Sequence, residues 1–180
     1  MKFTDLGVAF FTYCLVVIGY LAIRSEERST KISERAYIYG GVGTCFFDHQ
    51  NGQRMIRVCF TMANYGSTAG YLRHIEVGTA RLSDLPSEPY YIHCFGIWDL
   101  YFPGMTMRDV QTTRATVIVP DDGNHVVFQR VYYHDVFGVK HFSGSIYKMF
   151  VVTDAEGNVG IGNEPIAGGS TYWAWDKNDE

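Results

Sequence analysis

The chain has 180 residues, of which 47% are hydrophobic, 16% aromatic and 19% charged, and its formal net charge at pH 7 is -4. This length is ordinary for one domain with a real hydrophobic core. The negative charge and the absence of any Lys or Arg run argue against nucleic acid as a partner, because phosphate binding needs a basic face. Four cysteines without a C-x-x-C pair exclude a dense disulfide scaffold.

The first apolar segment, Leu6–Ile23, contains no charged residue. At about 1.5 Å per residue, a helix of this length spans about 27 Å, close to the hydrocarbon core of a bilayer. The segment lacks the small-x-small site of a cleaved signal peptide and the polar stripe of a surface helix. We therefore expect residues 1–23 to form an uncleaved transmembrane anchor (a signal-anchor), in preference to a cleaved signal or a buried core helix.

Charged residues begin abruptly after the apolar segment. Residues 24–33 are interpreted as a charged linker or as a continuation of the helix. Lys and Arg are more frequent after the segment than before it, so the positive-inside rule slightly favours a cytoplasmic domain over an exported one. Gly7 and Gly19 would allow this helix to pack closely against another.

From residue 34 onward the pattern changes to short β-like runs separated by turn signals. Asn51 and Gly52 form a hairpin signal, and Arg54–Met62 then alternates with period two, which is typical of a strand with one face on a core. Seven to nine such runs predict an antiparallel, immunoglobulin-like β-sandwich over residues 34–162. Residues 163–180 are a Gly- and Trp-containing tail. Further strand candidates are Tyr71–Val77, Tyr90–Trp98, Thr113–Val119, His125–Val136 and Val139–Thr153.

Three short motifs resemble those of a group of uncharacterised bacterial membrane-anchored proteins. The string Ala63-Asn-Tyr-Gly-Ser-Thr-Ala69 resembles the N-[YF]-G-x-T-P-A turn of that group, although it contains no proline. Glu34-Arg-Ala-Tyr-Ile-Tyr39 is similar to its opening strand. Tyr132-Tyr-His-Asp-Val-Phe-Gly138, followed by His141 and Phe142, is similar to its Y-x-D-x-F-G-x-x-H segment. The resemblance implies a bacterial source, one N-terminal transmembrane helix and an immunoglobulin-like domain, and it implies no activity.

Histidines near the Gly138 turn suggest one candidate metal site. His134 and His141 flank the turn and Asp135 lies beside it, so the three side chains could hold zinc or copper across a hairpin. The alternative is that Asp135 stabilises the turn and the histidines lie on the surface. No G-x-S-x-G or G-x-G-x-x-G frame is present. We therefore expect neither an enzyme nor a cofactor.

A disulfide between Cys45 and Cys59 depends on the register of the hairpin that they flank. With a two-residue loop at Asn51 and Gly52, Cys45 faces Val58 and the two sulfur atoms lie on opposite faces. With a three-residue loop, Cys45 lies opposite Cys59.

The expected function is that of a membrane-anchored interaction or accessory domain that binds a protein partner or a second copy of itself. Exposed aromatic side chains would supply the contacts, and Trp173 and Trp175 in the tail are the candidates most expected to be exposed. The alternatives are a metal-binding or enzymatic domain that uses His134, Asp135 and His141, and a structural subunit of a membrane complex. The expected location is the bacterial inner membrane, with a single span at Leu6–Ile23.

Overall fold

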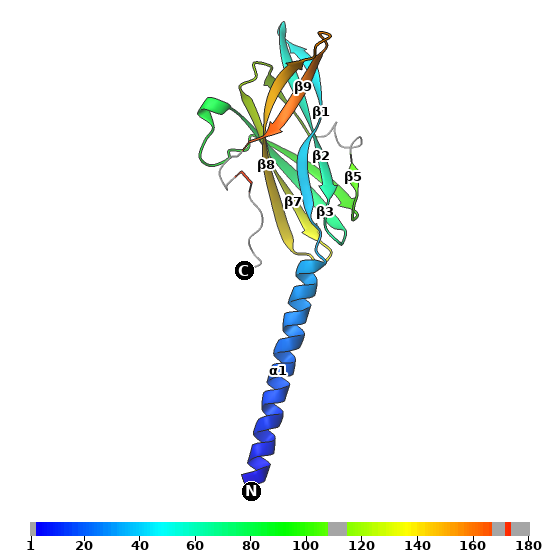
Figure 1. Ribbon diagram of the computed structural model, residues 1–180, viewed down its shortest axis with the longest axis vertical. Coiled ribbons are helices and arrows are strands. Elements are labelled where there is room, and N and C mark those ends of the chain that lie inside the picture. The colour runs from blue at the N-terminus through cyan, green and yellow to red at the C-terminus, as the bar shows by residue number, and fades with distance from the viewer. Residues whose placement is uncertain (1–2, 108–114, 167–171, 174–180) are drawn as a thin grey trace. The chain divides into compact units, whose positions relative to one another are not determined.

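A computed structural model describes residues 3–107, 115–166 and 172–173, and for residues 3–9, 31–33 and 106–107 it describes the backbone alone. The chain divides into two compact units, Met1–Glu34 and Arg35–Glu180. The first unit consists of a helix, and the second, called the β domain below, consists of strands (Figure 1). Each unit is considered by itself.

Helix α1 covers Phe3–Ser33 and therefore contains both the expected anchor and the charged segment that follows it. Its described part exposes large apolar side chains such as Phe10 and Val16. Within the described part of the chain, no helix is both long enough and apolar enough to cross a membrane. The span expected at Leu6–Ile23 is therefore not confirmed. The side chains of its first residues, 6–9, lie outside those that the structure describes.

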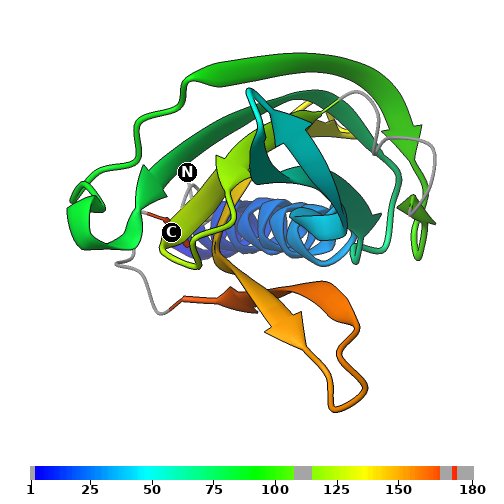
Figure 2. The same ribbon diagram turned by 90° about the horizontal axis from the view of Figure 1, so that it is seen from above.

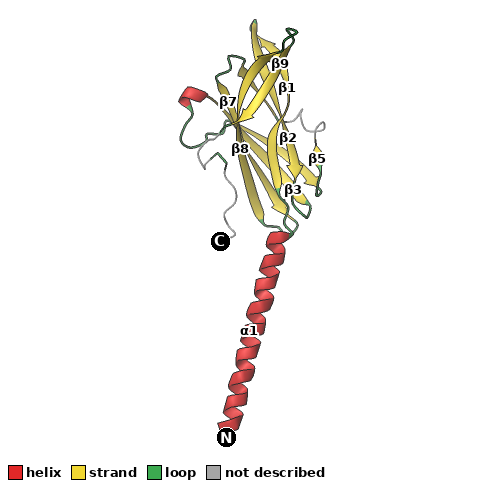
Figure 3. Cartoon of the chain, viewed as in Figure 1, coloured by secondary structure: helices red, strands yellow, loops and turns green. Residues whose placement is uncertain are grey.

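The β domain consists of two antiparallel sheets, whose strands are yellow in Figure 3. In the first sheet β2 (Gln53–Asn64) pairs on one side with β1 (Ile38–Gln50) and on the other with β5 (Thr106–Met107) and β6 (Thr116–Pro120). The second sheet has the order β4 (His93–Tyr101), β3 (Gly70–Arg81), β7 (His125–Asp135), β8 (Lys140–Thr153) and β9 (Val159–Pro165). A short helical turn, η1 (Leu82–Asp84), follows β3.

One hydrophobic core lies between the two sheets. The alternation in Arg54–Met62 predicted one buried face, and Ile56, Val58, Phe60 and Met62 are each at most 1% exposed. These side chains belong to the same buried cluster as residues of β3, β4, β7 and β8. The prediction for this strand is confirmed, and the domain is an antiparallel β-sandwich.

Strand β1 also lies against β8 of the opposite sheet. Ser143 Oγ donates a hydrogen bond to the carbonyl of Ile38 at 2.7 Å, and Ser145 Oγ donates one to the carbonyl of Gly40 at 3.0 Å. A Cβ atom at Gly40 would lie 2.6 Å from Val131 Cγ2, so this approach requires glycine. Figure 2 shows the β8–β9 hairpin, in orange, at the margin of the domain.

The hairpin between β1 and β2 has a two-residue loop. Asn51 and Gly52 both have positive φ angles, 51° and 78°, as a type I′ turn requires. Cys45 is therefore the partner of Val58, which is the register expected for a two-residue loop. Cys45 and Cys59 are free thiols.

The turn after β2 contains the first motif of the resemblance, and Asn64 is the residue at which it begins. This side chain is 1% exposed and makes four hydrogen bonds. Its Oδ1 atom accepts from the backbone N–H groups of Tyr37 (3.0 Å) and Gly66 (2.9 Å). Its Nδ2 atom donates to the carbonyls of Thr68 (2.8 Å) and Tyr101 (3.0 Å). Asn64 thus joins the start of β1, the turn and the end of β4.

Candidate functional site

The outer face of the second sheet, which points away from the core, has a covered half and an uncovered half. On the covered half, Phe128 of β7 and Ile146 of β8 form a second buried cluster with Tyr172. Tyr91, from the loop before β4, and Trp173 pack against the same cluster. Segments of the chain itself therefore protect this half from solvent.

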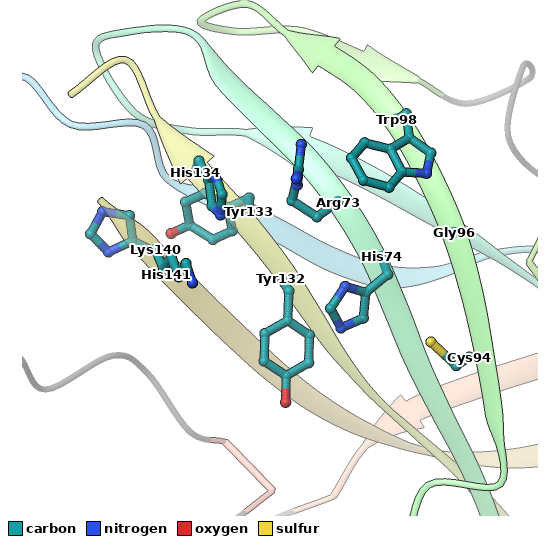
Figure 4. Close-up of a pocket in the computed structure, with 10 residues that line it drawn as sticks. All are labelled: Arg73, His74, Cys94, Gly96, Trp98, Tyr132, Tyr133, His134, Lys140 and His141. Carbon is teal, nitrogen blue, oxygen red and sulfur yellow. The ribbon is translucent and has the colours of Figure 1, made fainter. Parts of the chain in front are cut away.

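The uncovered half contains a pocket of about 460 Å³. This volume is in the range of small-molecule sites, which is roughly 300–1,000 Å³. The pocket lies over β3, β4 and β7 and reaches the start of β8 (Figure 4). It is lined by Arg73, His74, Cys94, Gly96, Trp98, Tyr132, Tyr133, His134, Lys140 and His141.

A β-bulge in β3 places two polar side chains next to each other in this pocket. The register of β3 shifts between Leu72 and His74 against both neighbouring strands. Leu72 and Ile75 are both buried in the core, at 0% and 1% exposure, so the two residues between them share the outer face. Arg73 and His74 therefore both line the pocket. Bulges commonly redirect side chains in this way at functional sites.

Aromatic rings hold these two side chains in place. The guanidinium carbon of Arg73 lies 4.0 Å from the centre of the Trp98 ring, a cation–π arrangement. The rings of His74 and Tyr132 are stacked, with their centres 4.4 Å apart. Gly96 pairs with His74 and contributes no side chain, which leaves the space beside Trp98 open (Figure 4). The pocket is therefore a preformed surface of rings and cations.

The electrostatic field in the pocket is positive. None of its ten lining residues carries a carboxylate. Arg73 and Lys140 make no hydrogen bond or ion pair with the residues that the structure describes. The pKa of His134 is lowered, first by desolvation and then by the positive charges of Arg73 and Lys140. The nearby carboxylate of Glu76 accepts a hydrogen bond from the hydroxyl of Tyr132 at 3.1 Å.

Arg130 lies next to the pocket, on the same face of β7. Its guanidinium lies over the rings of Tyr91 and Phe142, at 5.1 and 5.0 Å from their centres. Its Nε atom is buried without a hydrogen-bond partner among the described residues. The cation is held by ring faces, which adds to the positive field on this side of the sheet.

The structure brings together two of the three residues expected to bind a metal. Asp135 Oδ2 and His141 Nε2 are 3.0 Å apart, and both side chains are buried. Asp135 Oδ1 accepts the backbone N–H groups of Phe137 and Val139, each at 2.9 Å, as expected for a turn-stabilising aspartate. His134 points to the opposite face of β7 and lines the pocket. Among the described residues there is no group of three or more side chains able to hold a metal ion.

Trp173, the tryptophan of the tail that the structure describes, does not line this pocket. Trp173 is partly buried, and its Nε1 atom donates a hydrogen bond to the carbonyl of Ile166 at 2.8 Å. Its ring meets that of Tyr147 edge to face, so Trp173 packs on the second sheet. Trp175 lies outside the described residues. The described tryptophan that is largely exposed is Trp98, at 60%.

The sequence alone did not indicate the pocket, because the lining residues come from four different strands. One signal was present: in Tyr71–Val77 the buried positions Leu72, Ile75 and Val77 are spaced by three and then by two. That break in alternation indicates a bulge with two outward residues. The pairing of β3 with β7, which completes the pocket, has no such local signal.

No family model matches the chain, and neither the curated proteins nor the solved structures contain a match. The fold and the site therefore define the class of protein. It is an antiparallel β-sandwich with an aromatic and cationic pocket on the outer face of its larger sheet. The motif resemblance to bacterial membrane-anchored proteins stays a prediction.

Proposed function

We propose that this chain is a tethered binding module, in which the pocket of the β domain binds a ligand and α1 attaches the domain to a membrane. One observation carries the proposal. The chain covers half of the outer face with its own segments and leaves the other half open as a pocket of rings and of cations that have no ionic partner in the described part of the chain. Such concave, largely preformed sites are where small ligands bind.

The chemistry of the pocket favours binding over catalysis. Cys94 is its one strong nucleophile, and neither His74 nor His134 is hydrogen-bonded to it among the described contacts. Nucleophilic catalysis needs a base within hydrogen-bond reach of the nucleophile. His74 is stacked on Tyr132, which suits a ring platform for a ligand.

The tether is supported by the sequence of α1 and by one end of the β domain. Leu6–Ile23 contains no charged residue, and the described apolar side chains of α1 are exposed. Three loops lie at the end of the β domain that contains Arg35. The loop after β2 is hydrogen-bonded to Arg35, the loop after β4 is hydrogen-bonded to Asn64, and the loop after β7 follows the strand end that pairs with the start of β3. These loops expose apolar side chains, which suit a bilayer interface. The side chains are Tyr65, Phe102, Val136, Phe137 and Val139.

The proposed location of the tether is the inner membrane of a bacterium, with one span. Extraction of membranes with alkaline carbonate tests the attachment. The full chain is expected to stay in the membrane pellet, whereas the double variant Val16→Arg, Val17→Arg is expected to be released, because each buried charge costs about 2.5–3.5 kcal/mol. Release of the unaltered chain would contradict the tether. A reporter fused after Glu180 would give the side of the domain, for which the Lys and Arg count slightly favours the cytoplasm.

We also propose that the sandwich is immunoglobulin-like, on the basis of its strand order. Immunoglobulin-like sandwiches have strands A, B, E and D in one sheet and C, F and G in the other, with C′ added in the variable type. Assigning β1, β2 and β6 to A, B and E, and β3, β4, β7 and β8 to C, C′, F and G, reproduces these neighbours. Strand β5 departs from the pattern because it pairs with β2.

The binding role is tested by thermal unfolding of the full chain in mild detergent against a library of small molecules. Compounds that raise the unfolding temperature are expected to lose this effect on Trp98→Ala, which removes the exposed ring at the pocket. Phe46→Ala is the matched control, because Phe46 is an exposed ring (51%) on the other sheet. Compounds that stabilise Trp98→Ala as well as the unaltered chain would contradict binding at this pocket.

A further inference from the structure

We infer that the pocket binds an aromatic carboxylate, with the ring against Trp98, His74 and Tyr132 and the carboxylate at Arg73 and Lys140. This inference rests on the proposed binding role of the same pocket and assigns its ligand class. The ring is argued from the exposed aromatic surface and the carboxylate from the two cations, and the two parts meet where Arg73 lies over Trp98.

The ring part follows from the exposed aromatic surface. Trp98 is 60% exposed, although Arg73 lies over its ring, so Trp98 keeps aromatic surface open to a ligand. His74 and Tyr132 form a second, stacked platform from the neighbouring strands β3 and β7. Gly96 has no side chain and therefore leaves the space between these platforms open. A Cβ at this position would lie in van der Waals contact with Trp98 Nε1, at 3.6 Å. Offset stacking on such rings selects planar ligands.

The charge part follows from the cations. Arg73 and Lys140 project into the pocket from β3 and β8 and have no anionic partner among the described residues (Figure 4). A guanidinium that lies over an aromatic ring can still donate to a carboxylate, which it can bind with two hydrogen bonds. Two cations that face a mostly apolar pocket and have no partner among the described residues are suited to an anionic ligand.

Other ligand classes fit less well. A sugar needs hydrogen-bond acceptors for its hydroxyl groups, and the lining contains no carboxylate or carboxamide side chain. A small inorganic anion would leave the rings and most of the roughly 460 Å³ unused. A cationic ligand would meet the repulsion of Arg73 and Lys140. A planar ring with one carboxylate uses both parts of the pocket.

The pKa of His134 is expected to report whether a negatively charged ligand is bound in the pocket. The charged or titratable groups acting on it are Arg73 of β3, Lys140 and His141 of β8, and the adjacent Asp135. A bound carboxylate opposes the two cations, so it is expected to raise the pKa of His134. By linkage, the affinity for the anion is expected to increase as the pH falls through that pKa.

The test uses three probes with the full chain in mild detergent. Indole-3-acetate has both the ring and the charge, indole-3-acetamide has the same ring without the charge, and acetate has the charge without the ring. Calorimetry is expected to give an affinity for indole-3-acetate about tenfold or more above that for the amide, because charged hydrogen bonds are the stronger ones. Acetate is expected not to bind. NMR of the His134 ring, assigned with His134→Gln, is expected to show a raised pKa with indole-3-acetate alone.

Two variants complete the test. Arg73→Met keeps an unbranched side chain over Trp98 and removes the charge, so it is expected to bring the affinities for the acid and the amide close together. Arg54→Met, on the other sheet, is the control and is expected to keep the difference. Thermal unfolding confirms that each variant is folded.

The outcomes separate this inference from the proposed function. If the acid and the amide bind equally well and Trp98→Ala abolishes both, the pocket binds ligands but the assignment of an anion is wrong. If no probe binds, or if acid binding survives both Arg73→Met and Trp98→Ala, the aromatic carboxylate is overturned at this pocket. A preference for acetate over indole-3-acetate would also overturn it.

Discussion

Asn64 accepts the backbone N–H of Tyr37 at 3.0 Å, across 27 residues of sequence, while it is 99% shielded from solvent. The contact connects the turn that resembles a family motif to the strand that opens the β domain. It explains why that turn begins with Asn: a side chain with both an acceptor and a donor is needed to satisfy backbone groups on three segments.

Replacing Asn64 with Ala is expected to destabilise the β domain strongly. The change removes the Asn64 partner of three backbone groups, a buried one at Tyr101 and part-buried ones at Tyr37 and Thr68, at about 1–3 kcal/mol each where water cannot replace the amide. A total near 3 kcal/mol would lower the unfolding temperature by about 6–12 °C for a domain of this size. Asn163→Ala, at an exposed position, is the control for scanning fluorimetry. Equal effects of the two changes would contradict this role.

Two glycines are expected to tolerate no side chain. A Cβ at Gly66 would lie 2.4 Å from the carbonyl oxygen of Arg35 and 2.4 Å from the backbone nitrogen of Tyr37, which cannot move aside. Gly66→Ala and Gly40→Ala are therefore expected to lower the unfolding temperature markedly, as overpacking costs about 1–3 kcal/mol or more. Gly160→Ala meets its nearest neighbour at 3.4 Å and serves as the control. If Gly160→Ala were as damaging as the other two, the steric explanation would fail.

Asp135 is expected to contribute much more to stability than Asp154, although both close a hairpin. Asp135 is 7% exposed and bonds His141 and two backbone N–H groups, whereas Asp154 is exposed and bonds Asn158. Asp135→Ala is expected to cost about 2–4 kcal/mol because it removes three hydrogen bonds made by a buried carboxylate. Asp154→Ala is expected to cost less than 1 kcal/mol or so, since water replaces its contacts. Chemical denaturation of the two variants gives the comparison, and a larger loss for Asp154→Ala would refute it.

Local sequence patterns predicted the parts of this structure that depend on near neighbours. The period-two alternation of Arg54–Met62 gave the buried face of β2, and Asn51–Gly52 predicted a tight hairpin. The pocket depends on contacts across the sheet, such as the stacking of His74 on Tyr132 and of Arg73 on Trp98. Those contacts are set by which strands pair and by one bulge, and alternation within a single strand contains no information about its neighbours.

His134 predicts a specific pH dependence of stability. Its pKa is lowered in the folded protein, by desolvation and by Arg73 and Lys140, from a usual value of 6.5. Between the folded-state pKa and 6.5 the unfolded chain binds more protons, so stability present above pH 6.5 is lost as the pH falls below it. His134→Gln cannot take up the proton and is expected to lose less thermal stability between about pH 7.5 and 5.5. His49→Gln, at an exposed position on β1, is the control. A steeper loss in His134→Gln would show the opposite sign.

The cysteines of the β domain are expected to react with thiol reagents in a fixed order. Burial raises the pKa of Cys45 to about 11 and also raises that of Cys59, so at pH 8 few of these thiols are in the reactive thiolate form. Cys94 is exposed at the pocket and is expected to be alkylated first, which mass spectrometry of the digested protein would show.

Because Cys94 lines the pocket, indole-3-acetate is expected to slow its alkylation. Alkylation of Cys45 ahead of Cys94 in the folded chain would contradict the burial of the Cys45 thiol. Undiminished alkylation of Cys94 at saturating indole-3-acetate would mean that this ligand binds elsewhere.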